Sequence, residues 1–175
     1  MYSLYLFSRD ADVTASLKQY VASLNGRDSG FDLALYDTEL HTHAVDSDDA
    51  LTAKMLTTRV YAKVVWSEHN LSCSNGFDLR LRSSVPKQYG WFLGNGVGTI
   101  DADYCGELKA YLLKHQGNAK PWTSMCGNRI VQIVAPDLRP FLLIKVYDTQ
   151  QSWDTFLTNS LHIEDRNGGF GSTGQ

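Results

Sequence analysis

Five clusters along the 175-residue chain contain side chains that could bind a ligand or take part in a reaction. Each is common when taken alone. An arginine beside two hydroxyl groups, as in Arg82, Ser83 and Ser84, can hold phosphate oxygens through a charged fork and short hydrogen bonds. The clusters are SGFDL at 29–33, RSS at 82–84, NGVGTIDADYCGE at 95–107, GNRIVQ at 127–132 and RNGGFGSTG at 166–174.

Other residues in these clusters also suit a nucleotide phosphate. Asp32 and Asp101 are hard oxygen ligands or water-orienting groups, which fits a Mg²⁺ ion held largely by substrate phosphates. The glycine-rich tail offers Arg166, Ser172 and several backbone amides that could wrap a polyphosphate. Phe170 lies among those donors and could stack on a base. The residue types together therefore indicate a nucleotide phosphate site.

The composition is that of a globular chain with a real core. Hydrophobic residues make up 43% of it, charged residues 20%, and the net charge is −3. A basic groove for nucleic acid is therefore not expected. Three cysteines (Cys73, Cys105 and Cys126) without metal-type spacing favour a reduced, intracellular protein. We expect one β domain over residues 1–164 and a flexible arm over 165–175.

Short strands separated by turn sequences must position these clusters. Many short strands with few helices predict an all-β fold, a β-sandwich or barrel of jelly-roll type. The apolar stretch MYSLYLF lacks a basic leader and is expected to be a strand rather than a signal peptide. The predicted strands are Tyr2–Phe7, Phe31–Tyr36, Leu56–Val65, Phe77–Leu81, Gly106–Leu113, Arg129–Val134 and Phe141–Val146.

Two segments are expected to form short helices. Apolar residues recur at helical spacing over residues 11–24, and Asp10 or Asp12 is the expected N-cap. A second helix starting at Gln151 would rest its aromatic residues on the body of the domain. No apolar run approaches the ~20 residues needed to span a bilayer.

The five clusters occur in the order and approximate spacing of the five motifs of the trimeric dUTP pyrophosphatases, or dUTPases. This resemblance runs from Ser29 to Gly174. Its most specific parts are the Ile-Asp-x-x-Tyr-x-Gly-Glu hairpin and the terminal Gly-Phe-Gly-Ser-Thr-Gly. It implies a homotrimer that hydrolyses dUTP to dUMP and pyrophosphate with Mg²⁺. It also implies three active sites at subunit interfaces, each closed by an arm from a neighbouring subunit.

The resemblance implies a role for each matching residue. Asp101 would orient and deprotonate the attacking water, and Tyr104 would lie under the deoxyribose and exclude a ribose. Asp32 would support Mg²⁺ through coordinated water. Uracil recognition is implied for Asn95, Gly98, Ile100 and Phe170, and phosphate binding for Arg82, Ser83, Ser84, Gln132, Arg166, Gly171, Ser172 and Thr173.

The resemblance also implies a cellular setting. The implied substrate of the protein is dUTP, and neither a nucleic-acid partner nor membrane contact is expected. The implied location is intracellular, in the cytoplasm or nucleus. A virus-encoded protein that acts in a host cell is an alternative that remains open.

Plainer interpretations stand beside these roles. Asp101 alone could be a turn carboxylate, and Glu107 is expected to stabilise the hairpin rather than take part in catalysis. Cys105 is expected to be a semi-buried bystander. His41 and His43 could clip a metal, although surface histidines are favoured because no third ligand is evident. Three lysines are interpreted as a solvated surface: Lys109, Lys114 and Lys120.

Two other functions remain open. A dCTP deaminase would carry a catalytic glutamate where this chain has Tyr111, which argues against deamination. A dUTPase-like regulator that binds a protein partner is the third hypothesis, and the segments that look like insertions make it possible.

The tetrapeptide GFDL occurs twice, and the two copies are expected to differ in function. Strand alternation in the second copy would deliver Arg82 to the phosphates and leave Asp78 exposed, paired with a neighbouring charge. We therefore expect Asp32 to be the functional aspartate and Asp78 a structural one.

Overall fold

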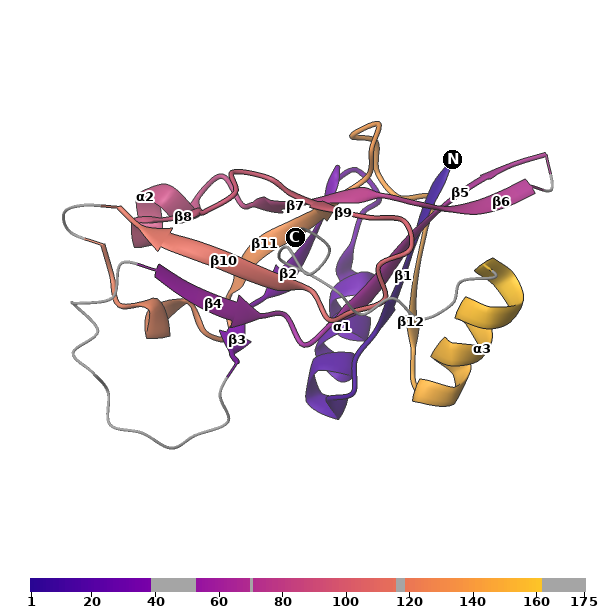
Figure 1. The fold of residues 1–175 in the computed structure, drawn as a ribbon, viewed down its shortest axis with the longest axis horizontal. Coiled ribbons are helices and arrows are strands. Elements are labelled where there is room, and N and C mark those ends of the chain that lie inside the picture. Colours follow the sequence, from indigo (N-terminus) through magenta and orange to yellow (C-terminus); the bar gives the residue numbers. More distant parts are fainter. Residues whose placement is uncertain (39–52, 70, 116–118, 162–175) are drawn as a thin grey trace, which may run out of the picture.

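The structure of the chain is a computed structural model that describes residues 1–38, 53–69, 71–115 and 119–161 (Figure 1). Over these residues the fold is mostly β, which confirms the coarse prediction from the sequence. The helices are α1 (Ala11–Ser23), α2 (Val85–Tyr89), the 3₁₀ turn η1 (Trp122–Met125) and α3 (Gln150–Leu161).

The described strands form three sheets of four strands each. The β1 sheet has the order β12-β1-β5-β6, the β10 sheet β3-β4-β10-β8, and the β7 sheet β2-β11-β7-β9. The strands are β1 (Tyr2–Phe7), β2 (Gly30–Ala34), β3 (Tyr36–Asp37), β4 (Ala53–Thr57), β5 (Tyr61–Glu68), β6 (Leu71–Asn75), β7 (Phe77–Leu81), β8 (Trp91–Leu93), β9 (Gly98–Ile100), β10 (Lys109–Lys114), β11 (Arg129–Val134) and β12 (Leu143–Tyr147).

One apolar core joins the three sheets. It contains residues from every sheet, such as Leu4 on β1, Ile133 on β11 and Leu112 on β10, all of them fully buried. The β7 and β10 strands alternate buried and more exposed residues, as expected for sheets with one solvated face. The outward faces of these two sheets are therefore free to carry polar side chains.

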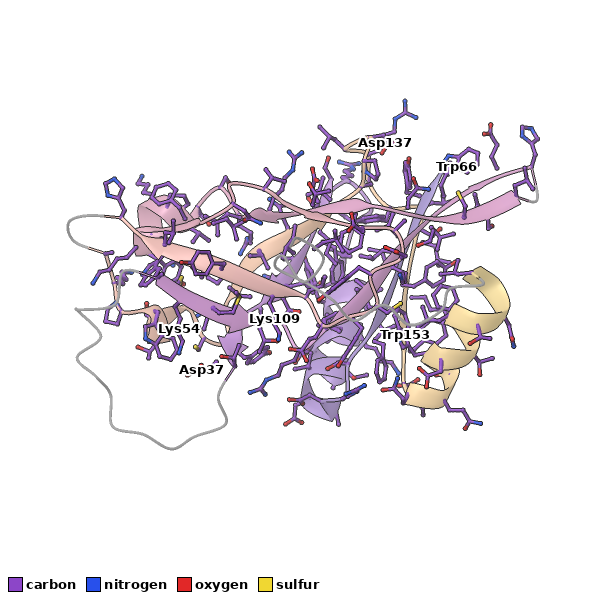
Figure 2. The ribbon with its side chains drawn as sticks, in the orientation of Figure 1. Asp37, Lys54, Trp66, Lys109, Asp137 and Trp153 are labelled. Carbon is purple, nitrogen blue, oxygen red and sulfur yellow. The ribbon has the colours of Figure 1, made fainter. Side chains whose placement is uncertain are left out.

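Helix α3 covers one face of the β1 sheet through a separate aromatic cluster. In Figure 1 this helix lies beside β12 and β1. Trp153 points from α3 toward these strands (Figure 2) and stacks near Phe7 at 6.0 Å between ring centroids. Phe156 stacks on Tyr5 at 4.5 Å. The predicted helix that rests its aromatic residues on the domain is therefore present.

Helix α1 begins where the sequence predicted. Asp10, one of the two proposed N-caps, accepts hydrogen bonds from the backbone amides of Asp12 and Val13. Its carboxylate also pairs with Arg59 at 2.9 Å. The buried face of α1, with Val13 and Leu17, packs into the main core.

The prediction of a single strand over Phe31–Tyr36 is wrong, because β2 ends at Ala34 and β3 starts at Tyr36 in another sheet. The prediction of a single strand over Leu56–Val65 is also wrong. The chain leaves β4 at Thr57 and starts β5 at Tyr61, so the two halves belong to different sheets. Arg59 adopts a positive φ of 57° in between. The amide of Thr58 donates to the carbonyl of Leu108, and the amide of Leu108 donates to the carbonyl of Val60. These hydrogen bonds satisfy backbone amide and carbonyl groups at the bend.

Some elements were not predicted. β6, β8, β9 and α2 are short, and the strand predicted from Gly106 starts only at Lys109. The residues between β9 and Lys109 form a turn-rich loop instead. Among the described helices, none is both long enough and apolar enough to cross a membrane.

Candidate functional site

A cavity of about 230 Å³ lies between strand β9 of the β7 sheet and strand β10 of the β10 sheet. One end is closed by the turn between β8 and β9, and the other by the loop between β9 and β10. The lining residues are Leu79, Leu93, Asn95, Gly98, Thr99, Ile100, Asp101, Tyr104, Leu108, Lys109 and Tyr111. The five hairpin residues to which the resemblance gave a nucleoside or water role therefore meet in one cavity.

The turn that carries Asn95 needs its glycines. Gly96 has a positive φ of 69°, and its amide donates to the carbonyl of Leu93 at 3.0 Å. Gly94 lies so close to Tyr111 that a Cβ there would approach the ring to 2.5 Å. Only a residue without a side chain lets the turn approach β10 this closely.

The loop after β9 places Asp101 and Tyr104 beside each other. The amide of Tyr104 donates to the carbonyl of Asp101 at 3.1 Å, which closes a turn. The Tyr104 hydroxyl donates to the carbonyl of Glu107 at 2.9 Å. Burial raises the pKa of this phenol, and the neighbouring Glu107 raises it further. The ring is thus held as a neutral wall of the cavity, while Asp101 stays exposed.

Glu107 braces this loop from behind. The hydroxyl of Thr57 donates to its carboxylate, which links the loop to the end of β4. Burial raises the pKa of Glu107, and Lys109, Arg59 and Arg9 act in the opposite direction. Its contacts agree with the predicted structural role.

A second polar group lies on the β7 sheet and its connecting turn. Asp32 on β2 stands opposite Gln132 on β11, and Arg82 follows directly after β7. The Arg82 Nε lies 2.9 Å from the Asp32 carboxylate, and its Nη1 donates to the carbonyl of Arg129. Gln132 donates to the carbonyl of Leu81 at 3.4 Å. We call Asp32, Arg82 and Gln132 the polar row.

The charge of Asp32 is balanced by its neighbours. Burial raises the pKa of this carboxyl, whereas Arg82, Arg129 and a hydrogen bond from Tyr20 lower it, and the net direction is upward. Tyr20 belongs to α1, and the Arg129 guanidinium lies over its ring at 4.5 Å. Helix α1 therefore contributes directly to the surroundings of the polar row.

The serines after Arg82 sit in the turn that starts α2. Ser83 and Ser84 are both exposed. The amide of Val85 donates to the carbonyl of Arg82, and the amide of Gln88 donates to that of Ser84. The two hydroxyls are thus carried at the end of β7, next to the polar row.

The two GFDL copies differ in their surroundings. Asp78 on β7 accepts two hydrogen bonds from Arg80, at 2.7 and 3.2 Å. This local pair agrees with the prediction that Asp78 is bonded to a neighbouring charge. Asp32 instead pairs with Arg82 from another strand end and belongs to the polar row.

Known proteins of one kind are similar to this chain. A deoxyuridine 5′-triphosphate nucleotidohydrolase of Desulfitobacterium hafniense is 37% identical over 94 residues, which are 53% of each chain. The enzyme of the same name from a Wolbachia of Brugia malayi is 36% identical over 104 residues, 58% of this chain and 59% of the relative. The curated relatives that match this chain are dUTPases.

The chain spans little more than half the length of these dUTPases in the matched segments. A solved dUTPase of Streptococcus mutans is 26% identical with a TM-score of 0.39, covering 69% of this chain and 82% of that one. No family model matches the chain.

The strand β10 residues Lys109 and Tyr111 line the cavity without a role implied by the dUTPase resemblance. Lys109, labelled on β10 in Figure 2, was interpreted as solvated surface, yet it also lines the cavity, as does Tyr111. Both are exposed and alternate along β10 with buried neighbours. The period-two pattern after Glu107 was the signal that could have found them.

The remaining dUTPase motif residues lie outside the described residues. These are the arm residues Arg166, Phe170, Gly171, Ser172 and Thr173. His41 and His43, which were weighed separately as a possible metal site, also lie outside the described residues. Within the described ranges, histidine, cysteine, aspartate and glutamate side chains nowhere gather in groups of three or more that could hold a metal. Cys105 is buried, and its thiol donates to the carbonyl of Asp103.

Proposed function

We propose that this protein is a dUTP diphosphatase that hydrolyses dUTP to dUMP and pyrophosphate, limiting uracil in DNA and supplying dUMP. The observation that carries the proposal is the cavity, where Asn95, Tyr104 and Asp101 line one hollow. Its volume is below the ~300–1,000 Å³ of pockets for whole drug-sized ligands. It therefore suits a nucleoside whose triphosphate extends outside.

Within this proposal the cavity residues select the nucleoside. Asn95 and the backbone of Gly98–Ile100 read the uracil edge and leave no space for a methyl group. Tyr104, held by its bond to the Glu107 carbonyl, lies under the deoxyribose and leaves no room for a 2′-hydroxyl. A fixed ring discriminates better than a mobile one, because the wrong substrate cannot push it aside at low cost.

Asp101 is the proposed base. It is exposed at the rim of the cavity, where it would orient a water molecule for in-line attack on the α-phosphorus and accept its proton. Pyrophosphate is the leaving group. Positioning of the water and neutralisation of the phosphate charge supply most of the rate in such reactions.

The polar row and the adjacent serines would hold the phosphates. Arg82 offers a charged fork, and Ser83, Ser84 and Gln132 offer neutral donors. The proposed arm residues Arg166, Gly171, Ser172 and Thr173 would close over the γ-phosphate, with Phe170 stacked on uracil. The arm over residues 165–175 follows the proposed domain, residues 1–164.

Mg²⁺ is the proposed cofactor. A single carboxylate such as Asp32 suits an ion that keeps several waters and takes most other ligands from phosphates. Bound Mg²⁺ would neutralise phosphate charge as pyrophosphate departs. Asp32 would hold it through a coordinated water.

We also propose a jelly-roll homotrimer with sites between subunits. The polar row is not part of the cavity lining among the described residues, so the cavity and the row do not form one pocket in this protomer. A neighbouring protomer could bring them together. An intracellular location, cytoplasmic or nuclear, follows from the availability of dUTP, and no nucleic acid or membrane partner is proposed.

A dCTP deaminase is disfavoured by the cavity itself. Tyr111, at the position of the deaminase glutamate, lines the cavity with a phenol rather than a carboxylate. A purely regulatory function is not favoured, because the proposed catalytic base Asp101 is present at the cavity.

The direct test is pyrophosphate release from dUTP, dTTP, dCTP and UTP with Mg²⁺. We expect strong preference for dUTP. The Asp101→Asn variant should still bind dUTP but turn it over at least ~100-fold more slowly, the scale of a lost general base. Equal use of all four nucleotides, or near-normal turnover by the variant, would contradict the proposal, and ammonia release from dCTP would favour deamination.

A further inference from the structure

Lys63 is a buried charged side chain to which the proposed reaction gives no role. It lies on β5 in the β1 sheet and is only 1% exposed, among the largest fully buried side chains of the described chain. Burying an ammonium group costs several kcal/mol unless polar partners compensate it. Such a residue is costly to keep for packing alone, because an apolar side chain would fill the same volume without that cost.

The Lys63 ammonium reaches the loop that carries the proposed base. Its Nζ donates to the carbonyl of Ala102 at 2.9 Å. The hydroxyl of Ser74, on the neighbouring strand β6, donates to the same carbonyl at 2.6 Å. One backbone oxygen next to Asp101 therefore receives two hydrogen bonds from adjacent strands of a sheet that contributes nothing to the cavity lining.

The strands that supply these donors are well fixed. β5 pairs with β1 on one side and with β6 on the other, and Lys63 stands opposite Tyr5 on β1. Tyr5 packs against the aromatic cluster beneath α3. The ammonium group is thus anchored to a rigid part of the domain, and its bond transfers that rigidity to Ala102.

Ala102 is well placed to control the cavity. It follows Asp101 directly, and it lies within the turn that the Tyr104 amide closes onto the Asp101 carbonyl. Fixing the Ala102 carbonyl fixes the peptide plane between these residues. Both the proposed base and the proposed sugar-discriminating ring depend on that turn.

We propose that Lys63, together with Ser74, is a positioning residue that holds the Asp101–Tyr104 turn in its productive conformation. This inference rests on the proposed dUTP hydrolysis and assigns a part of it to the β1 sheet. Lys63 does not touch the substrate. It acts through the backbone of Ala102.

Kinetics of Lys63→Met test this role, because methionine keeps much of the side-chain length without the ammonium. We expect kcat for dUTP to fall about 10- to 100-fold, the scale of a displaced catalytic group, with KM changed less than about threefold. Lys63→Arg, which retains a buried cation and donor, should recover part of the loss. Ser74→Ala should lower kcat in the same direction by a smaller factor.

Lys54→Met is the matched control. Lys54 pairs with Asp37 at 3.1 Å and lies over the Trp122 ring at 4.2 Å. Lys54 and Asp37 are both labelled in Figure 2. It is a largely buried lysine with polar and aromatic partners but does not line the cavity. We expect its kcat to stay within about twofold of the parent, as for a substitution that leaves the reacting groups in place.

Hydrogen exchange of the Tyr104 amide gives a readout that needs no substrate. Loss of the Lys63 or Ser74 donor should speed this exchange, because the turn would open more often. Lys54→Met should not. If the parent protein does not hydrolyse dUTP, the proposed function fails while this measurement still tests the positioning role.

Unchanged kcat together with unchanged Tyr104 exchange in folded Lys63→Met would overturn the proposal. So would an equal loss of kcat in Lys54→Met, because the effect would then be general destabilisation. If Lys63→Met does not fold, Ser74→Ala decides by the same two measurements, since Ser74 lies near the surface and its loss leaves Lys63 in place.

Discussion

At the scale of single residues, partners separate groups that look alike in the sequence. Asp32 and Asp78 share the same tetrapeptide context, yet Asp32 pairs with Arg82 beside Gln132, whereas Asp78 is bonded within its own strand to Arg80. The Asp32 pair joins two segments and lies beside Gln132, whereas the Asp78 pair stays within one strand. Their chemistry should therefore differ.

The two aspartates can be compared directly. Asp32→Ala should lower Mg²⁺-dependent dUTP turnover much more than Asp78→Ala, because only Asp32 belongs to the polar row. The measurement is kcat/KM over a Mg²⁺ titration. Equal losses would show that the row is not the phosphate site.

Burial of Glu107 makes the stability of the folded protein depend on pH. Its folded-state pKa is raised above the ordinary value of 4.5, with burial as the main cause. The folded protein therefore prefers the protonated form. The contribution of protonated Glu107 to the free energy of unfolding is fully present below pH 4.5. It is lost as the pH rises through the folded-state pKa.

Glu107→Gln should make this visible. Glutamine cannot ionise and keeps an oxygen acceptor for Thr57, so the stability of the variant relative to the parent should improve as the pH rises above 4.5. Urea unfolding at several pH values measures it. Glu68→Gln, at the exposed end of β5, controls for the lost negative charge, and a pH-independent difference for Glu107→Gln would contradict the assignment.

At the scale of elements, the helices act on the site from outside it. Helix α1 brings Tyr20 to Asp32, and α3 covers the sheet from which Lys63 reaches the Ala102 carbonyl. Neither helix lines the cavity. Their contribution is to hold strands whose ends carry the chemistry.

The start of α1 should be sensitive to one side chain. Asp10→Ala removes two hydrogen bonds to helix amides and the pair with Arg59, and should cost about 1 kcal/mol, within the ~0.5–2 kcal/mol range of lost N-caps. Urea unfolding measures the free energy. Asp12→Ala in the same turn is the control, because the Asp10 carboxylate is the one that caps the helix. Equal effects would refute the capping assignment.

At the scale of the whole molecule, the polar row is not among the described residues that line the cavity. The cavity lies between β9 and β10, and the polar row lies on β2, β11 and the turn after β7. A site that needs both halves is incomplete in a single chain. The proposed trimer would complete it.

Subunit mixing tests this arrangement. Asp101→Asn and Arg82→Gln should each be nearly inactive, but mixed trimers should contain some sites with an intact cavity and an intact polar row. Random mixing of equal amounts gives up to about a quarter of the parental turnover if each site draws on two subunits. Turnover that stays at the level of the separate variants, or a monomer in sedimentation, would argue against shared sites.

The sequence by itself determined the local features of this protein. Short runs between turn sequences predicted the bounds of β1, β7 and β11, and helical spacing with an N-cap predicted α1. Hairpin residues close together in the chain were expected to act together, and Asn95, Asp101 and Tyr104 do line one cavity. These features depend on interactions between near neighbours, which a local pattern records.

Only the tertiary structure decided the long-range pairings. The bend at Arg59 depends on bonds to Leu108, 49 residues further along, and three-residue strands such as β8 and β9 exist because partner strands satisfy their backbones. The bond from Lys63 to the Ala102 carbonyl joins strand β5 to the loop between β9 and β10. The sequence around Lys63 cannot predict this hydrogen bond, because the acceptor is a backbone oxygen that only folding brings near.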